Sequence, residues 1–174
     1  MKKIVLLFVI LFGAFNLQAQ NYSSTGRVGY INTEEILNSI PEYKVAQDKL
    51  ETLSNEYQSR IESEYKKIES LYKQYQSMKA SLSEAVKSQK ENDIITKERA
   101  VKELQNSYFG EDGTMKEKSD EYLTPIKNRV QKAIDIVAEK GNYMLLIDIA
   151  SMQGVVYAKE SDNLNKLILN ILEN

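Results

Sequence analysis

The sequence contains no cysteine and no histidine. Without cysteine no disulfide can form, so helix packing or assembly must hold the fold together. Without histidine, the commonest general base and the commonest metal ligand are both missing. No phosphate-binding loop, dinucleotide fingerprint or nucleophile beside a base occurs either. We therefore expect no enzymatic activity, no metal and no cofactor; an enzyme with an unusual site is the remaining alternative of that kind.

Glycine and proline are also scarce, and the 68 residues from Glu42 to Phe109 contain neither. Apolar residues recur there every three or four positions, at Leu50, Leu53, Tyr57, Ile61, Tyr65, Ile68, Tyr72, Tyr75 and Met78. A second series is spaced mostly by seven, then by three or four, at Ile94, Val101, Tyr108, Met115, Tyr122, Ile126, Val130, Ala133 and Val137. A narrow apolar seam on a polar helix is typical of a coiled coil, and the seam must meet another helix.

The best position for a turn in this long helix is residues 80–84. Ser81 followed by Glu84 matches a capping box, and Ser83 is also a good N-cap. Pro41 and Pro125 each lie 42 residues from Ser83, so folding there brings the two prolines level. The sequence thus predicts an antiparallel hairpin whose arms are each roughly 60 Å long.

A competing turn is Gly110-Glu111-Asp112-Gly113, which contains a good turn dipeptide. Folding at that point would leave two arms of very unequal length. We therefore interpret this segment as a local break within the second arm.

Before the arm, residues 27–32 form a short segment with an alternating pattern and β-branched residues, which predicts a strand. Asn32 or Thr33 can cap a short helix that follows, with Glu34 in its first turn, where the helix dipole favours carboxylates. Pro41 interrupts that helix, because the residue before a proline is disfavoured in helical conformation.

After the arm, the helix is expected to end at Lys140 with Gly141 as its C′ residue. Residues 143–149 form a nearly continuous apolar run, which predicts a strand covered on both faces. A third strand is expected at Val155–Ala158. Ser161 or Asp162 is expected to cap a last amphipathic helix bearing Leu164, Leu167, Ile168 and Ile171.

The predicted fold is α+β and predominantly α: a long helical hairpin projecting from a small β-sheet body formed by both chain ends. Residues 20–41 and 126–174 make the body, and residues 42–125 make the arm. A body of short strands and helices buries too little apolar surface to be stable alone, so we expect an obligate oligomer. The candidate oligomerisation residues are Val28, Tyr30, Leu145, Ile147, Ile149 and Val155.

Residues 1–19 match a secretory signal peptide. Lys2 and Lys3 precede an apolar segment, Ile4–Phe15, that is short for a membrane span, and Ala19 offers a cleavage site. No cysteine follows, which excludes a lipoprotein signal; a retained anchor is the alternative. The remaining chain has 21 basic and 25 acidic residues, a net charge of −4, so we do not expect nucleic acid as a partner.

Charged groups on the arm mostly alternate at helical spacing, as Glu62 and Lys66 do. A solvated helix face laced with ion pairs explains this pattern better than an acid–base pair. Asp148 lies in an apolar run, where we expect it to pair with Arg27 or with a backbone donor at the strand end.

Seven of the eleven tyrosines lie between Glu42 and Lys140. They can simply fill the seam, although each buried hydroxyl needs a partner. A loosely packed seam rich in tyrosine and methionine also leaves amphipathic surface that can bind many apolar segments weakly. The candidate residues for binding such segments of another protein, here called a client, are Tyr57, Tyr65, Tyr72, Tyr75, Met78 and Tyr108.

Several segments resemble the Skp/OmpH family of periplasmic chaperones, in the form found in Bacteroidetes-type bacteria. They are the signal peptide, residues 28–32, 35–43, Leu123 with Pro125-Ile126, residues 130–134, 137–141, Tyr157-Ala158 and residues 161–164. Each motif alone is weakly specific, but the order and spacing of the motifs are specific. Together they span essentially all of the chain after the signal peptide.

The resemblance implies a periplasmic homotrimer whose strands form a central barrel-like body with three helical tentacles around a cavity. It further implies that the tentacles hold unfolded outer-membrane proteins without ATP. The best-known members are strongly basic, whereas this chain is acidic, which argues against lipopolysaccharide or membrane binding. Asn165 stands where the family often has threonine. The alternative function is a structural coiled-coil spacer or adaptor of the cell envelope, for which continuous Leu/Ile heptads would be expected.

Overall fold

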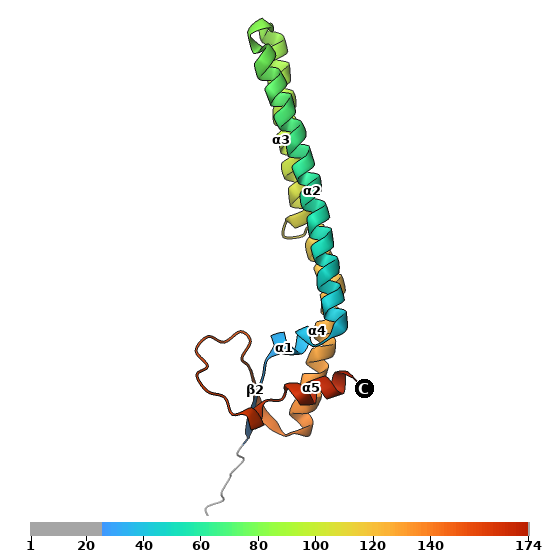
Figure 1. Ribbon diagram of the computed structural model, residues 1–174, viewed down its shortest axis with the longest axis vertical. Helices are drawn as coiled ribbons and strands as arrows, with labels where there is room; N and C mark the ends of the chain where they lie inside the picture. Colours follow the sequence, from blue (N-terminus) through green and yellow to red (C-terminus); the bar gives the residue numbers. More distant parts are fainter. Residues whose placement is uncertain (1–25, 174) are drawn as a thin grey trace, which may run out of the picture.

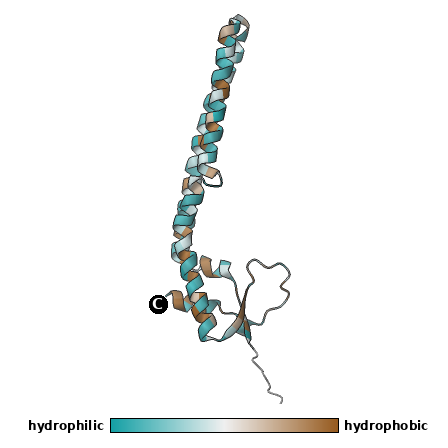
Figure 2. Cartoon of the chain, turned by 180° about the vertical axis from the view of Figure 1, so that it is seen from behind, coloured by the Kyte–Doolittle hydropathy of each residue, from teal (hydrophilic) through white to brown (hydrophobic). Residues whose placement is uncertain are grey.

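The computed structural model describes residues 26–173, so the predicted signal peptide lies outside the described residues. Figure 1 shows a long helical pair projecting from a small body in which both ends of the described chain meet. One side of the pair is α2 (Pro41–Met78), and the other is α3 (Glu84–Phe109) followed by α4 (Thr114–Lys140). Figure 2 shows that the pair is mostly hydrophilic outside, with apolar segments spaced along it. The predicted mainly helical fold with a hairpin arm is confirmed.

The tip of the arm lies where the sequence places it. α2 ends at Met78, a short 3₁₀ turn η1 (Lys79–Ser81) follows, and Ser83 is the N-cap of α3. The predicted capping box does not form, because the Ser81 hydroxyl donates instead to the Met78 carbonyl oxygen at 2.9 Å. Ser83 caps by its extended backbone alone.

The predicted break between Gly110 and Gly113 separates α3 from α4. A Cβ at Gly110 would collide with the Asn106 carbonyl oxygen, so the tight turn requires glycine there. The break shifts the register of the hairpin. Tyr57 stacks on Tyr108, and these lie 26 and 25 residues from Ser83.

Below the break, Glu42 pairs with Arg129, and these residues lie 41 and 46 residues from Ser83. Pro41 and Pro125 are therefore out of level by about five residues, because the turn residues add length to the second arm only. Pro125 lies inside α4, which continues through it to Lys140. The left-handed residue after α4 is Asn142 (φ 50°) and not Gly141, where a Cβ would strike the Tyr143 ring.

The sheet has two parallel strands, β1 (Arg27–Ile31) and β2 (Tyr143–Asp148). The other edge of β1 is bridged by Asn163, and the Leu164 N–H donates to the Tyr30 carbonyl oxygen at 3.0 Å. The expected third strand at Val155–Ala158 does not form, and these residues are exposed. β-Propensity depends strongly on context, and in the described chain this segment pairs with no strand.

β2 is not covered on both faces within the single chain, in contrast to the expectation. Leu145 is 50% exposed. Met144, which lies at the register shift between Arg27 and Val28, is 69% exposed. Leu146 packs instead toward the body core, and Val28 on β1 shares the exposed face with Leu145, its register partner. The apolar run of β2 therefore leaves one face of the sheet uncovered.

The body core forms where α1 (Thr33–Asn38) and α5 (Asn165–Leu172) pack beside α4. Ile36, Leu164 and Ile168 are fully buried, which stabilises the fold by roughly 1.5–3 kcal/mol for each side chain. The core extends into the base of the arm through Ala46, Tyr122, Leu123, Ile126 and Val130. It thus joins both chain ends to the arm.

A buried polar group joins the N-termini of α1 and α5. The Asn165 side-chain oxygen accepts from the Asn32 N–H at 2.9 Å, and its amide donates to Glu35 at 2.8 Å. Asn32 caps α1, as predicted, by accepting from the Glu35 N–H. The expected caps of α5 are wrong: a 3₁₀ turn η2 (Glu160–Asp162) intervenes, and Asn163 accepts from the Asn165 N–H.

Asp148, at the end of β2, accepts three hydrogen bonds. They come from the Thr33 hydroxyl at 2.6 Å, the Thr33 N–H at 3.1 Å and the Ala150 N–H at 3.0 Å. Burial alone would raise the pKa of this carboxyl, but the hydrogen bonds outweigh burial and hold the pKa below its usual value of 3.8. The predicted backbone partner is confirmed, whereas Arg27 bonds to Gly141 and Tyr143 instead.

We predict that Asp148→Asn lowers the free energy of unfolding at pH 7 by about 1–3 kcal/mol, because the neutral amide cannot accept all three bonds. A carboxyl with a depressed folded pKa contributes stability above its unfolded pKa and loses it as pH falls through the folded pKa. The gap between the two proteins should therefore shrink below pH 3.8. Urea unfolding at several pH values measures it. Asp48→Asn, an exposed control, should show no gap, and a pH-independent gap for Asp148→Asn would contradict the assignment.

Candidate functional site: the helical arm

The seam of the upper arm is narrow and regular. Its buried residues are Ile61, Ile68 and Tyr75 on α2, facing Ile94 and Val101 on α3. Partly buried side chains complete it at Leu71, Leu82, Leu104 and Tyr108. Intervals of seven, as in a coiled coil, run through both helices.

Tyr65 and Tyr72 do not belong to the seam, although the sequence series placed them in it. They are 42% and 52% exposed. Leu71 occupies the inward position instead, and one further residue turns a side chain by about 100° around the helix axis. A spacing of three or four residues is compatible with either Leu71 or Tyr72 in the seam. Only the packing against α3 shows which of the two faces inward.

Other large apolar side chains on the arm are also exposed. They are Val45, Met78, Val86, Ile95 and Phe109. Of these, only Met78 was among the candidate client-binding residues. Val86, Ile95 and Phe109 were missed because the prediction followed the regular apolar series. Their position outside that series was the signal that could have identified them as exposed. The arm therefore presents scattered apolar groups on a polar surface.

Tyr57 and Tyr108, two further candidates, face each other across the hairpin. Their rings stack with centroids 4.1 Å apart and an interplanar angle of 3°. Phe109 meets both rings edge-on, at 6.4 Å from Tyr57 and 6.5 Å from Tyr108. The two edge-on contacts of Phe109 have the geometry that stabilises by about 0.5–1.5 kcal/mol per pair beyond area burial, so this cluster anchors the end of α3 just above the break.

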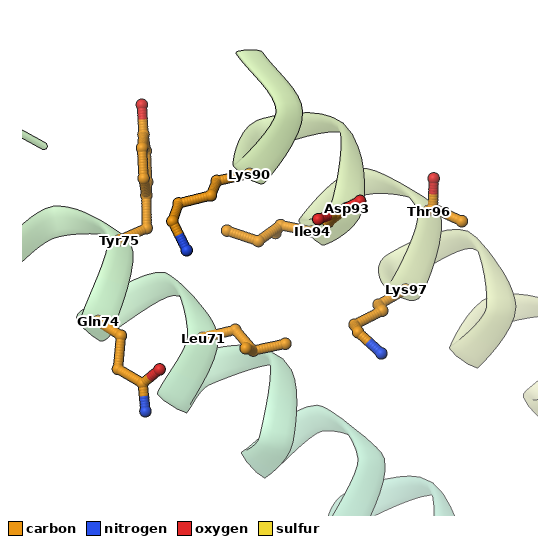
Figure 3. A pocket seen from close by; sticks show the side chains of 8 residues that line it. All are labelled: Leu71, Gln74, Tyr75, Lys90, Asp93, Ile94, Thr96 and Lys97. Atoms are coloured by element: carbon orange, nitrogen blue, oxygen red, sulfur yellow. The ribbon is translucent and has the colours of Figure 1, made fainter. Parts of the chain in front are cut away.

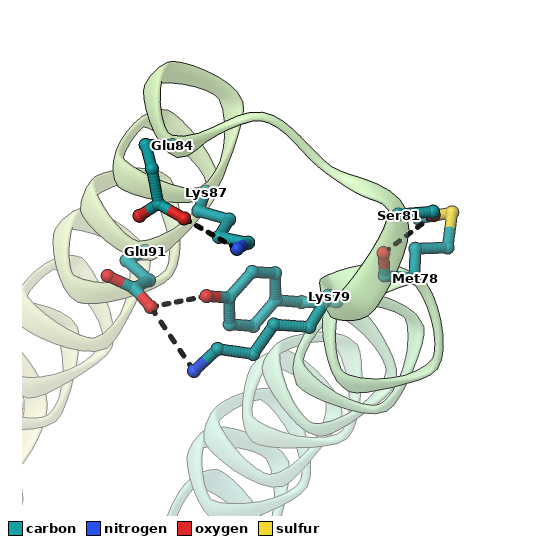
Figure 4. Close-up of polar contacts among 7 residues, drawn as sticks. Met78, Lys79, Ser81, Glu84, Lys87 and Glu91 are labelled. Carbon is teal, nitrogen blue, oxygen red and sulfur yellow. Dashed lines mark hydrogen bonds and ion pairs between the residues drawn. The ribbon is translucent and has the colours of Figure 1, made fainter.

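Tyr75 is only 3% exposed and closes the seam near the tip. Its hydroxyl donates to the Glu91 carboxylate, which also pairs with the Lys79 ammonium at 3.8 Å. Figure 4 shows Lys79 of η1 and Glu91 of α3 converging beside the Glu84–Lys87 ion pair. The hydrogen bond to Glu91, together with burial, raises the pKa of Tyr75 to about 12. Tyr75 is therefore a neutral structural donor and not an accessible binding residue.

A hollow of about 310 Å³ lies between α2 and α3 near the tip (Figure 3). Leu71 and Ile94 form apolar walls on its two sides, and charged groups from Lys90, Asp93 and Lys97 surround them. Such a lining suits weak apolar contact with a flexible chain. It does not place a nucleophile beside a base.

The charge of the arm is uneven along its length. Residues 66–90, around the tip, contain six lysines and two glutamates, a net charge of +4. Residues 103–121, around the break, contain six acidic residues and two lysines, a net charge of −4. The acidic balance of the whole chain therefore does not describe the tip.

Within residues 26–173, no helix is both long enough and apolar enough to cross a bilayer. The same residues contain no group of three or more acidic, histidine or cysteine side chains arranged to hold a metal ion. The described residues also leave one face of the sheet uncovered and several apolar side chains of the arm exposed.

The fold matches a solved structure, that of an OmpH-like protein of Caulobacter crescentus CB15 described as a candidate outer membrane chaperone. The TM-score is 0.65 at 13% sequence identity, and the match covers 85% of this chain and 84% of that one. No curated protein matches the chain. The family model for OmpH-like outer membrane proteins matches residues 27–172. Because this match spans nearly all described residues, the chain belongs to the OmpH/Skp-like family of outer membrane protein chaperones, a family not known for enzymes.

Proposed function

We propose that the chain is an ATP-independent holdase that binds unfolded outer-membrane proteins between its helical arms and prevents their aggregation. The observation that carries this proposal is the set of exposed apolar side chains along the arm, which packs against the body only at its base. Tyr65 and Tyr72 are the leading contacts, because both are exposed and belong to no seam.

Scattered contacts suit this task better than a single deep pocket. An unfolded client offers many apolar segments of different shapes, and amphipathic or flexible side chains can meet each of them weakly. Each contact buries little area, so the client remains mobile and can be released without an energy source. Met78 at the tip and the hollow at Leu71 and Ile94 extend the same surface.

A trimer would place three arms around one client. Val28 pairs in register with Leu145, and Tyr30 with Ile147, so these four residues share the uncovered face of the sheet. Ile149 comes directly after the end of β2, and its N–H donates to the Ile31 carbonyl oxygen. Covering this face by other copies would remove apolar surface from water, with the exposed Val155 segment as a further contact.

The proposal includes the periplasm as location and residues 1–19 as a cleaved signal peptide. It also divides the mature chain into a body, residues 20–41 and 126–174, and an arm, residues 42–125. The body core reaches into the base of the arm at Ala46 and Tyr122, which supports a stiff attachment.

A spacer function is less consistent with the seam. No side chain of α2 is buried between Ala46 and Ile61, and opposite it only Gly113 is buried between Val101 and Ile126. A strut that transmits force would be expected to keep its heptads filled there. The interruption leaves the arm loosely packed in its middle.

We predict that Tyr65→Ser/Tyr72→Ser weakens holding and leaves folding and assembly intact, because neither ring is in the core. Suppression of aggregation of an unfolded outer-membrane barrel protein, followed by light scattering, should require about threefold more variant than wild type. Loss of one or two partly exposed aromatic contacts, each worth about 0.5–1 kcal/mol, gives that size.

Gln47→Ser/Gln76→Ser, which changes two exposed polar residues of the same helix, is the matched control and should behave as wild type. Equal holding by the tyrosine variant would contradict the assignment of these residues. A wild-type protein that suppresses no aggregation would overturn the holdase function and favour the envelope spacer.

We also predict that Leu145→Ser/Ile147→Ser abolishes assembly, because both residues lie on the uncovered face and not in the body core. The solution mass by multi-angle light scattering should fall from three chains to one, with the helical circular dichroism signal retained.

Val45→Ser/Ile136→Ser, which removes exposed apolar groups from the arm and α4, should remain fully assembled. A variant at Leu145 and Ile147 that stays trimeric, or a wild-type protein that is monomeric, would refute assembly through this face.

A further inference from the structure

A second hollow, of about 580 Å³, lies at the opposite end of the molecule from the tip, where α4 ends against α5. Val137, Tyr143, Leu167 and Ile171 line it with apolar groups. Val137 is buried, whereas Leu167 is half exposed, so the hollow has a dry floor and an open side. It takes no part in the seam or the uncovered sheet face.

Two cations, Arg27 and Lys140, stand on the rim, and none of the described residues that line the hollow is acidic. The Arg27 guanidinium is fixed in place: it donates to the Gly141 carbonyl oxygen at 3.1 Å and to the Tyr143 hydroxyl at 2.9 Å. Its carbon atom lies 4.4 Å from the Tyr143 ring centroid. These bonds use two of its five N–H donors, so others remain for a ligand.

The helix end would by itself repel an anion, since the last carbonyls of α4 carry partial negative charge. Arg27 offsets this by bonding to the Gly141 carbonyl oxygen, and Lys140 forms no ion pair among the described residues. An apolar floor below two cations is complementary to a group that is apolar and carries one negative charge.

We propose that this hollow binds the carboxyl terminus of an unfolded client, with the last apolar side chain on the floor and the α-carboxylate between Arg27 and Lys140. A terminal residue carries both groups on one Cα, which an internal residue cannot offer. Capture of a chain end by fixed donors is a known mode of peptide recognition. The inference rests on the proposed function only in that the ligand is an unfolded polypeptide.

The test uses the whole mature protein and two fluorescent peptides that end in phenylalanine, one with a free carboxylate and one with a terminal amide. Fluorescence anisotropy should show the carboxylate form binding about three- to tenfold tighter, as two partly exposed ion pairs give. Lys140→Gln, which leaves Arg27 in place, should reduce this preference to about two- to threefold. Lys132→Gln, an exposed lysine of the same helix outside the hollow, should keep it.

Equal binding of the two peptides, binding of neither, or an unchanged preference in Lys140→Gln would overturn the inference. Decanoate that binds through Lys140 while the peptides do not would assign the hollow to a fatty acid and refute the peptide site. Aggregation assays on the same variants separate the two proposals: Lys140→Gln should still suppress aggregation. A wild-type protein without the carboxylate preference that still holds clients leaves the holdase standing and removes only this site.

Discussion

The parallel pairing of β1 with β2 is the constraint on which the rest of the structure depends. Two adjacent parallel strands cannot be joined by a tight turn, so the chain must leave the sheet and return to it. In this protein the return path is the whole hairpin arm. The contacts of Asp148 with Thr33 and of Asn165 with Asn32 then fix both chain ends around the buried Ile36, Leu164 and Ile168.

The arm consists of two packed parts with a poorly packed joint between them. The upper part has its own core from Ile61 to Tyr75, and the lower part shares the core of the body through Ala46 and Ile126. The break at Gly110–Gly113 and the five-residue shift of register lie between them. Because buried apolar area is what stiffens a helical hairpin, we expect local opening to cost least at this joint.

The surface of the arm combines charged groups with exposed apolar side chains, as the proposed binding of apolar clients requires. Ion pairs such as Glu62–Lys66 and Glu69–Lys73 are exposed, so each adds little stability and mainly keeps the helix in solution. Exposed apolar side chains lie among them: Tyr72 is on the upper arm, and Tyr65 and Phe109 line one shallow hollow. Contact with a client thereby remains possible.

The sequence by itself determined the elements that rest on local rules: the helix free of glycine and proline, the tip near Ser83, the break at Gly110 and the Asn32 cap. These follow from backbone freedom and helical period, which residues carry with them. Tertiary structure alone decided which residue of the pair Leu71 and Tyr72 faces inward, because only the partner helix selects between adjacent positions. It likewise left Val155–Ala158 unpaired and turned Asp148 toward Thr33, because a strand edge and a part-buried donor exist only once distant segments have met.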